Sequence, residues 1–281
     1  MIAYLLAIGC ALSYGAADFI GGWTTRRAPA VAVVAVSQLG GLVLLGPLVP
    51  FASPGLPSAH DLLWGAVAGL AAGTGILLLY RALAVGTMSV VSPATAVTAV
   101  SIPVLVRIAA GERPAPLPAL GIGLAIAAIV LVSRQRSTAP AGGGRLPSGL
   151  AIALASGVGF GVFYLALAQT RHEAGAWPLL AMNVVTVSLF GGLALFRDEL
   201  RRMPRPMAKM AALCGIFDFG AHALYLFAVR EGPLPSVVTL SSLYPATTII
   251  LARLILRERL TGWQMAGIAC ALAATVLIVR G

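Results

Sequence analysis

Long apolar segments alternate with short polar breaks along the whole chain. Each apolar segment has about 20 residues, the length an α-helix needs to cross a bilayer, and each ends at glycine, proline or a group of arginines. This pattern predicts an all-α integral membrane protein with ten transmembrane helices. The predicted helices lie at residues 2–22, 30–51, 61–82, 87–109, 116–133, 148–169, 176–196, 207–229, 234–255 and 261–280.

The chain also repeats itself at an offset of 146 residues. Residues 121–134 read GIGLAIAAIVLVSR and residues 267–280 read GIACALAATVLIVR, with eight of fourteen positions identical. The same offset places Tyr14-Gly15 on Phe160-Gly161. Two similar apolar halves are typical of transporters built from internal repeats.

Each repeat contains five of the predicted helices. We expect a first repeat at residues 1–133, a polar and glycine-rich linker at 134–147 and a second repeat at 148–281. An odd number of spans turns the second repeat over relative to the first. The sequence therefore predicts two inverted five-helix repeats, an arrangement that can open alternately to each side of a membrane.

Composition supports a membrane location. Hydrophobic residues make up 59% of the chain and charged residues 10%, against about 25% charged residues in soluble domains. The net charge of +10 comes from arginines at helix ends and in connections. They form no basic stripe for a phosphate backbone, so we expect no nucleic-acid partner. The first apolar run has no basic residues before it, and we interpret it as a retained helix of a multi-pass protein of the cell (inner) membrane.

The orientation in the membrane follows from the distribution of basic residues. The first, third, fifth, seventh and ninth connections, with their flanking helix ends, carry fourteen of the nineteen Arg and Lys. The positive-inside rule places these connections in the cytoplasm and both termini outside.

Several short motifs recur in the two halves. They are the aromatic-Gly pairs Tyr14-Gly15 and Phe160-Gly161, the sequence Gly111-Glu112-Arg113 with its counterpart Arg257-Glu258-Arg259, and Pro245 thirteen residues before Glu258. With these motifs the chain resembles the EamA-like branch of the drug/metabolite transporter superfamily. The resemblance implies ten helices in two repeats, a central cavity between the halves, and export of amino acids or other metabolites. It also implies cytoplasmic termini, the opposite of the charge count.

The eighth predicted helix carries an acidic residue near its middle. An ionised carboxylate there costs about 2.5–3.5 kcal/mol on insertion scales, so Asp218 needs a partner or a wet cavity. His222 and Tyr225 follow at i+4 and i+7 and share its helix face. An Asp–His pair could bind a polar substrate or carry a proton. The alternative is a buried pair that only fixes helix packing.

Further candidates for the substrate site come from three other helices. Asp18 shares a face with Tyr14, and the repeat places these two residues on Tyr164 and Phe160. Ser241 and Tyr244 precede Pro245, which leaves a backbone carbonyl without its donor, and such stretches are allowed where they line a cavity.

Two arginines recur at equivalent positions in the repeats. Arg107 and Arg253 each precede a glutamate by five residues. We expect each to reach towards the membrane surface and form a local ion pair. The alternative is that each of these ion pairs is a gate, which forms in one access state and breaks in the other.

These observations favour a secondary transporter of a small polar metabolite, working by alternating access. Proton coupling and facilitated diffusion both stay open. The alternatives are a non-transporting scaffold or sensor that kept the fold, and an exporter of organic cations in which Asp18 would be the essential carboxylate. No phosphate loop, metal-ligand spacing or nucleophile motif is present, so we expect no enzyme activity, cofactor or bound metal.

Overall fold

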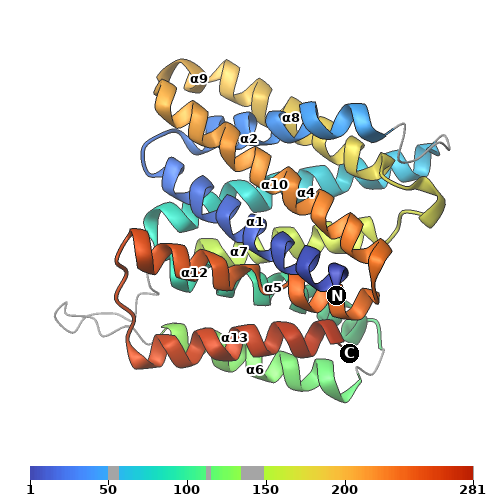
Figure 1. Ribbon diagram of the computed structural model, residues 1–281, viewed down its shortest axis with the longest axis vertical. Helices are drawn as coiled ribbons and strands as arrows, with labels where there is room; N and C mark the ends of the chain where they lie inside the picture. The colour runs from blue at the N-terminus through green and yellow to red at the C-terminus, as the bar shows by residue number, and fades with distance from the viewer. Residues whose placement is uncertain (50–56, 112–114, 134–148, 281) are drawn as a thin grey trace.

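The computed structural model describes residues 1–49, 57–111, 115–133 and 149–280 (Figure 1). The chain is all-helical in these ranges. The α-helices are α1 (Ile2–Thr25), α2 (Ala30–Leu45), α4 (Ala59–Val85), α5 (Met88–Ala109), α6 (Pro116–Ser133), α7 (Leu150–Leu167), α8 (Trp177–Phe196), α9 (Glu199–Arg202), α10 (Arg205–Glu231), α11 (Leu234–Ser241), α12 (Tyr244–Ile255) and α13 (Gly262–Arg280). Short 3₁₀ turns lie at Gly46–Leu48 and His172–Ala174.

Every predicted segment contains a helix, but the count of ten membrane spans is not confirmed. Eight segments in the described ranges are long and apolar enough to cross a membrane, and one of them, Ser236–Ile255, comprises most of α11 and all of α12. α2 and α6 are shorter apolar helices. The predicted end of the second helix is wrong, because α2 stops at Leu45 and a 3₁₀ turn begins at Gly46. Pro47 follows there, and proline has no N–H to continue an α-helix. Residues 50 and 51 lie outside the described ranges.

The ninth predicted segment is divided into α11 and α12. Pro245 is the second residue of α12 and cannot donate to the carbonyl of Ser241, so the helix breaks between Ser241 and Tyr244. By contrast, α5 continues through Pro93 and Pro103.

The two repeats exchange their packing partners. The first helix of each repeat packs against helices of the other repeat. α1 packs against α10 and α12, and α7 packs against the equivalent helices α4 and α5. Gly15 and Gly161 make this close approach possible. A Cβ at Gly15 would meet the Thr247 side chain at 2.4 Å, and one at Gly161 would meet Ile102 at 2.4 Å. Each of these contacts thus has an equivalent in the other half, at the same offset of 146 residues that relates the two sequences.

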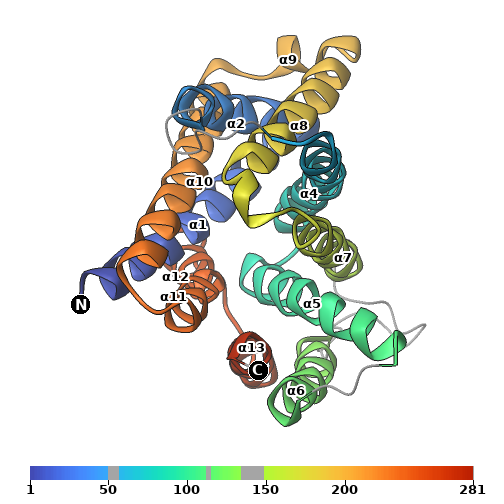
Figure 2. The ribbon, with the colours of Figure 1, turned by 90° about the vertical axis from the view of Figure 1, so that its right-hand side faces the viewer.

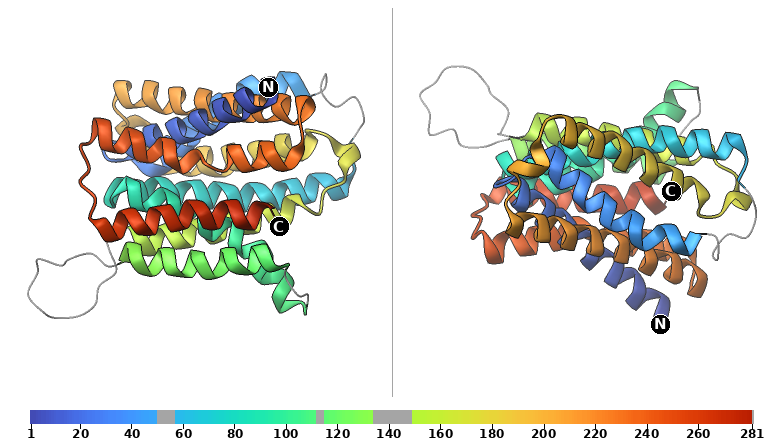
Figure 3. Two further views of the ribbon diagram at one scale, coloured as in Figure 1. Left: turned by 60° about the horizontal axis from the view of Figure 1, so that its bottom comes forward. Right: turned by 90° about the horizontal axis from the view of Figure 1, so that it is seen from above.

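The helix ends gather on two opposite sides of the bundle, at the left and right of Figure 1. We call the side with Met1 and Arg280 the terminal face, and the side with the connections at 26–29, 86–87, 203–204 and 256–261 the distal face. The left view in Figure 3 shows α6 and α13 side by side at one edge of the bundle, in agreement with their mutual packing.

The core is distributed unevenly between these faces. In the distal half, one continuous apolar cluster joins α1, α2, α4, α5, α7, α8, α10 and α12. In the terminal half, the buried apolar residues fall into separate clusters of α1, α10 and α11, of α4, α7 and α8, and of α5, α6 and α13. Figure 2, in which both termini are towards the viewer, shows these groups of helices.

One helix pair breaks the symmetry between the repeats. α1 packs closely on α4 near the distal face, where a Cβ on Gly21 would meet the Tyr80 ring at 2.4 Å and one on Gly22 would meet Leu83 at 2.4 Å. The equivalent pair, α7 and α10, does not pack extensively within the described residues. The bundle is therefore closed towards its distal face and less tightly joined towards its terminal face.

Candidate functional site

Aromatic side chains from three helices meet around Tyr14, near the middle of α1. The Tyr14 and His222 rings lie edge to face, with centroids 5.2 Å apart and an interplanar angle of 74°. Tyr244, at the start of α12, makes a similar contact with Tyr14 at 6.1 Å. The close approach of α1 and α12 at Gly15, where Thr248 Oγ1 donates to the Gly15 carbonyl at 3.1 Å, places these rings together.

Two carboxylates lie in the same region. Asp18 on α1 lies within electrostatic range of Asp218 on α10, and Tyr14 also lies within range of Asp218. The Oδ2 atom of Asp18 is buried and accepts no hydrogen bond. A buried carboxylate without a donor is costly, so this atom needs a proton, a water or a cation from a ligand.

The predicted Asp218–His222 side-chain pair does not form. His222 Nδ1 instead lies 2.8 Å from the backbone carbonyl oxygen of Asp218, one helical turn earlier. The imidazole reaches this carbonyl because side chains on a helix point back towards its N-terminus. With Nδ1–H donating to the carbonyl, Nε2 is the nitrogen that remains for a ligand or a proton. The Asp218 carboxylate stays available for another partner.

Tyr164 and Tyr225 complete the set of predicted tyrosines. Tyr164 on α7 interacts electrostatically with Asp18 and Tyr225, although 43% of its surface is exposed. Tyr225 on α10 also interacts with Tyr14. We call the seven residues Tyr14, Asp18, Tyr164, Asp218, His222, Tyr225 and Tyr244 the polar cluster.

Ser241 lies next to this cluster at the end of α11. Its hydroxyl is buried beside the Cys10 thiol and makes no other hydrogen bond. The thiol is a weak partner, so the hydroxyl retains most of its capacity to bind a polar group. All eight predicted site residues therefore lie in one part of the bundle. Their role in binding a substrate stays a prediction.

The chemistry of the polar cluster is acidic and aromatic. It combines two carboxylates, an imidazole and four phenol groups, and none of the interactions that join its members involves Lys or Arg. Carboxylates and aromatic faces both attract a positive charge, the second through the ring quadrupole. Within the described residues, no group of three metal-ligating side chains comes together.

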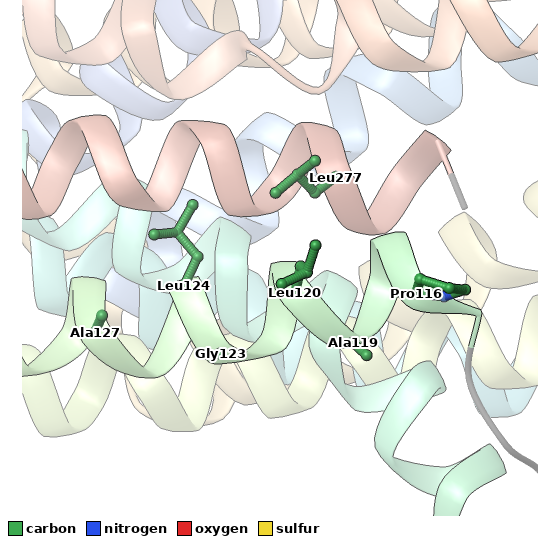
Figure 4. Close-up of a pocket in the computed structure, with 7 residues that line it drawn as sticks. All are labelled: Pro116, Ala119, Leu120, Gly123, Leu124, Ala127 and Leu277. Carbon is green, nitrogen blue, oxygen red and sulfur yellow. The ribbon is translucent and has the colours of Figure 1, made fainter.

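A second concave surface has very different chemistry. It lies between α6 and α13, away from the polar cluster, and none of its lining residues has a polar side chain (Figure 4). It therefore offers a polar metabolite no side-chain hydrogen-bonding partner. The lining residues are Pro116, Ala119, Leu120, Gly123, Leu124, Ala127 and Leu277.

An ion pair that the sequence does not predict joins the two repeats. Arg171 Nη2 donates to Asp61 Oδ2 at 2.7 Å, and the Arg171 backbone N–H donates to Oδ1 at 3.0 Å. Asp61 is fully buried and also forms a capping box with Ser58 at the start of α4. The Ser58-x-x-Asp61 spacing is a recognisable helix-start signal. No local pattern connects it to Arg171, which lies 110 residues further along the chain.

Glu258 also has an unexpected partner. The local ion pair predicted for Arg253 and Glu258 is absent from this described region, and the Glu258 carboxylate instead binds the backbone of Met88 and Ser89. Glu112, the predicted partner of Arg107, lies outside the described residues.

Comparison with known proteins gives two matches. The family model described as the EamA-like transporter family matches residues 1–134 and 147–280. The chain is also similar to an uncharacterized protein of Methanocaldococcus jannaschii, with 27% identity over 130 residues. Those residues make up 92% of that protein and 46% of this chain, so the relative is little longer than one repeat.

Proposed function

The chain belongs to the EamA-like transporter family, and from this premise we propose that it is a secondary transporter of a small metabolite that carries a protonated amine, such as an amino acid. The observation that carries the proposal is the occurrence of two carboxylates, Asp18 and Asp218, within the apolar helices of a multi-pass membrane bundle. An intramembrane carboxylate is costly and marks a substrate or ion path.

The chemistry of the polar cluster supports an amine as the group that is recognised. An ammonium group between Asp18 and Asp218 would remove their mutual repulsion and satisfy the Oδ2 atom of Asp18. The faces of Tyr14 and Tyr244 would add cation–π attraction. The hydroxyl of Ser241 and the Nε2 atom of His222 would bind the polar remainder of the substrate.

The uneven packing of the bundle supports alternating access. The distal half has one continuous core and the terminal half has separate clusters, so we propose that substrate reaches the polar cluster from the terminal face. Exchange of the asymmetric contacts between the two repeats would close that face and open the other. Outward transport is the direction that the family resemblance implies.

The same carboxylates offer a route for proton coupling. The Oδ2 atom of Asp18 is buried without a hydrogen-bond partner, and a proton bound there in the absence of substrate would be displaced by an arriving ammonium group. Each substrate molecule would then exchange for a proton. An exporter of organic cations would use the same two groups, and substrate size would separate it from an amino-acid carrier.

Ligand-induced stabilisation tests the proposed substrate class. The purified protein would be melted in detergent with amino acids, other amines, organic cations, nucleosides and sugars. A ligand that binds only the folded state adds about 2.7 kcal/mol at a hundredfold excess over Kd. We expect an amine-bearing compound to raise Tm and Asp218→Asn to abolish the rise, while Glu231→Gln, at the exposed end of α10, keeps it. Stabilisation by sugars or nucleosides alone would contradict the proposal, and a scaffold would respond to no solute.

A further inference from the structure

The carboxylate of Glu258 caps the N-terminus of α5. Glu258 lies in the connection between α12 and α13, and it accepts three hydrogen bonds from the first turn of α5. The Met88 N–H donates to Oε1 at 2.8 Å, the Ser89 N–H to Oε2 at 3.0 Å, and the Ser89 hydroxyl to Oε2 at 2.7 Å. The first N–H groups of a helix have no partner within it, and the positive end of the helix dipole attracts an anion.

This cap ties the two repeats together at the distal face. Glu258 belongs to the second repeat and α5 to the first, and Met88 is fully buried in the continuous distal core. A further polar bond at this face lies within the first repeat, where Arg26 in the α1–α2 connection donates to the carbonyl of Leu83, close to the end of α4, at 3.3 Å. The distal face is thus held by polar bonds as well as by apolar packing.

The second repeat cannot offer the same cap at the terminal face. The repeat offset places Met88 and Ser89 on Leu234 and Pro235. Proline has neither a backbone N–H nor a hydroxyl, so only one of the three donors remains there for Glu112, the counterpart of Glu258. The three-donor cap of Glu258 is therefore not repeated at the start of α11.

We propose that Glu258 is a latch that holds the distal face shut and releases α5 whenever that face opens. This inference rests on the proposed function, because only a protein that alternates between two access states needs to release the contact. Since the second repeat lacks two of the three donors, the latch favours the state that is closed at the distal face.

Cys214 is a natural reporter of this face. Its side chain is fully buried in the distal core, where its thiol lies 3.1 Å from the Tyr80 hydroxyl and donates to the Ala17 carbonyl at 3.1 Å. The measurement is the alkylation rate of Cys214 by N-ethylmaleimide in detergent, with Cys10 and Cys270 replaced by alanine. A closed distal face protects the thiol, and an open one exposes it.

Two variants remove the latch from opposite partners. Glu258→Gln removes the charge and one acceptor, and Ser89→Pro copies the second repeat while keeping a residue that the first turn of a helix accepts. We expect each to raise the alkylation rate about tenfold, the effect of losing a charge-assisted hydrogen bond. Glu231→Gln should leave the rate unchanged. Wild-type rates in both latch variants, each folded and monodisperse, would overturn the proposal.

The outcome is separable from that of the proposed function. Faster alkylation in both variants, with no solute bound or transported by the wild-type protein, would support a latch in a protein that is not a carrier of the tested solutes. Measured flux with unchanged alkylation would support the proposed transport function and contradict the proposed latch. If Glu258→Gln fails to fold, Ser89→Pro and the milder Ser89→Ala decide alone.

Discussion

Gly111 and Arg257 hold the same position in the two repeats, and both have a left-handed backbone, with φ of 90° at Gly111 and 54° at Arg257. Each follows the last helical turn before a Glu-Arg sequence, and the Glu258 N–H reaches back to the Ala252 carbonyl at 3.4 Å. Left-handed residues commonly end helices in this way, and glycine adopts the conformation without strain. Arg257 keeps the same geometry at a cost, and that geometry positions Glu258.

Replacing Arg257 by glycine should therefore stabilise the protein. We expect Arg257→Gly to raise the free energy of unfolding by about 0.5–1 kcal/mol. A residue with a side chain pays about 1–2 kcal/mol to adopt the left-handed conformation, and glycine does not. Part of this gain is offset because glycine has more conformational entropy in the unfolded chain. The measurement is Tm in detergent. Arg259→Gly is the matched control, because Arg259 has no positive φ, and it should not stabilise. Equal effects of the two substitutions would contradict the strain argument.

The approach of α1 to α12 depends on the missing side chain at Gly15. A methyl group there would lie 2.5 Å from the Tyr244 carbonyl oxygen, so Gly15→Ala should push the two helices apart. We expect a loss of about 1–3 kcal/mol of stability, as in other overpacked interiors, together with a loss of ligand binding. Gly191→Ala on α8, where nothing lies within 4 Å of an added Cβ, should have no such effect. Thermal melts with and without ligand provide both readouts.

The bond between Arg171 and Asp61 should matter more than an ordinary surface pair. Asp61 is fully buried, and Arg171→Ala would leave its carboxylate with the hydroxyl and N–H of Ser58 and one backbone N–H. We expect a clear fall in Tm, and a smaller additional fall when Asp61→Asn is combined with it. Arg201→Ala, which breaks the exposed pair with Asp198 at 3.6 Å, should change Tm little. Equal changes in the two arginine variants would argue against a special role for the buried carboxylate.

The fold was largely predictable from sequence because the bilayer imposes a length on each helix and the repeat is visible without alignment. The family and the two-repeat organisation were predicted and are confirmed. The exchange of packing partners was not predicted, although the glycines that permit it, Gly15 and Gly161, belong to the aromatic-Gly pairs of the two repeats. A sequence pattern shows which face of a helix carries small residues, but it does not show which other helix packs against that face.

The candidate site was predictable in composition but not in geometry. Charged and aromatic residues within apolar segments stand out, so Asp218, His222 and Tyr14 could be selected one by one. The bond that His222 makes is to a backbone carbonyl, and every helix offers many such acceptors. Glu258 was missed as a cap because its donors are 170 residues away in sequence, in the other repeat.

Solute flux in liposomes tests the central claim most directly. Proteoliposomes with the wild-type protein would be preloaded with the compound that stabilises it, and the uptake of radiolabelled compound in exchange would be measured. We predict exchange well above protein-free liposomes, its loss in Asp218→Asn, and wild-type exchange in Glu231→Gln at equal incorporation. Exchange that is the same in Asp218→Asn and Asp18→Asn as in the wild-type protein would contradict the account, because the substrate would then cross the membrane without the two carboxylates.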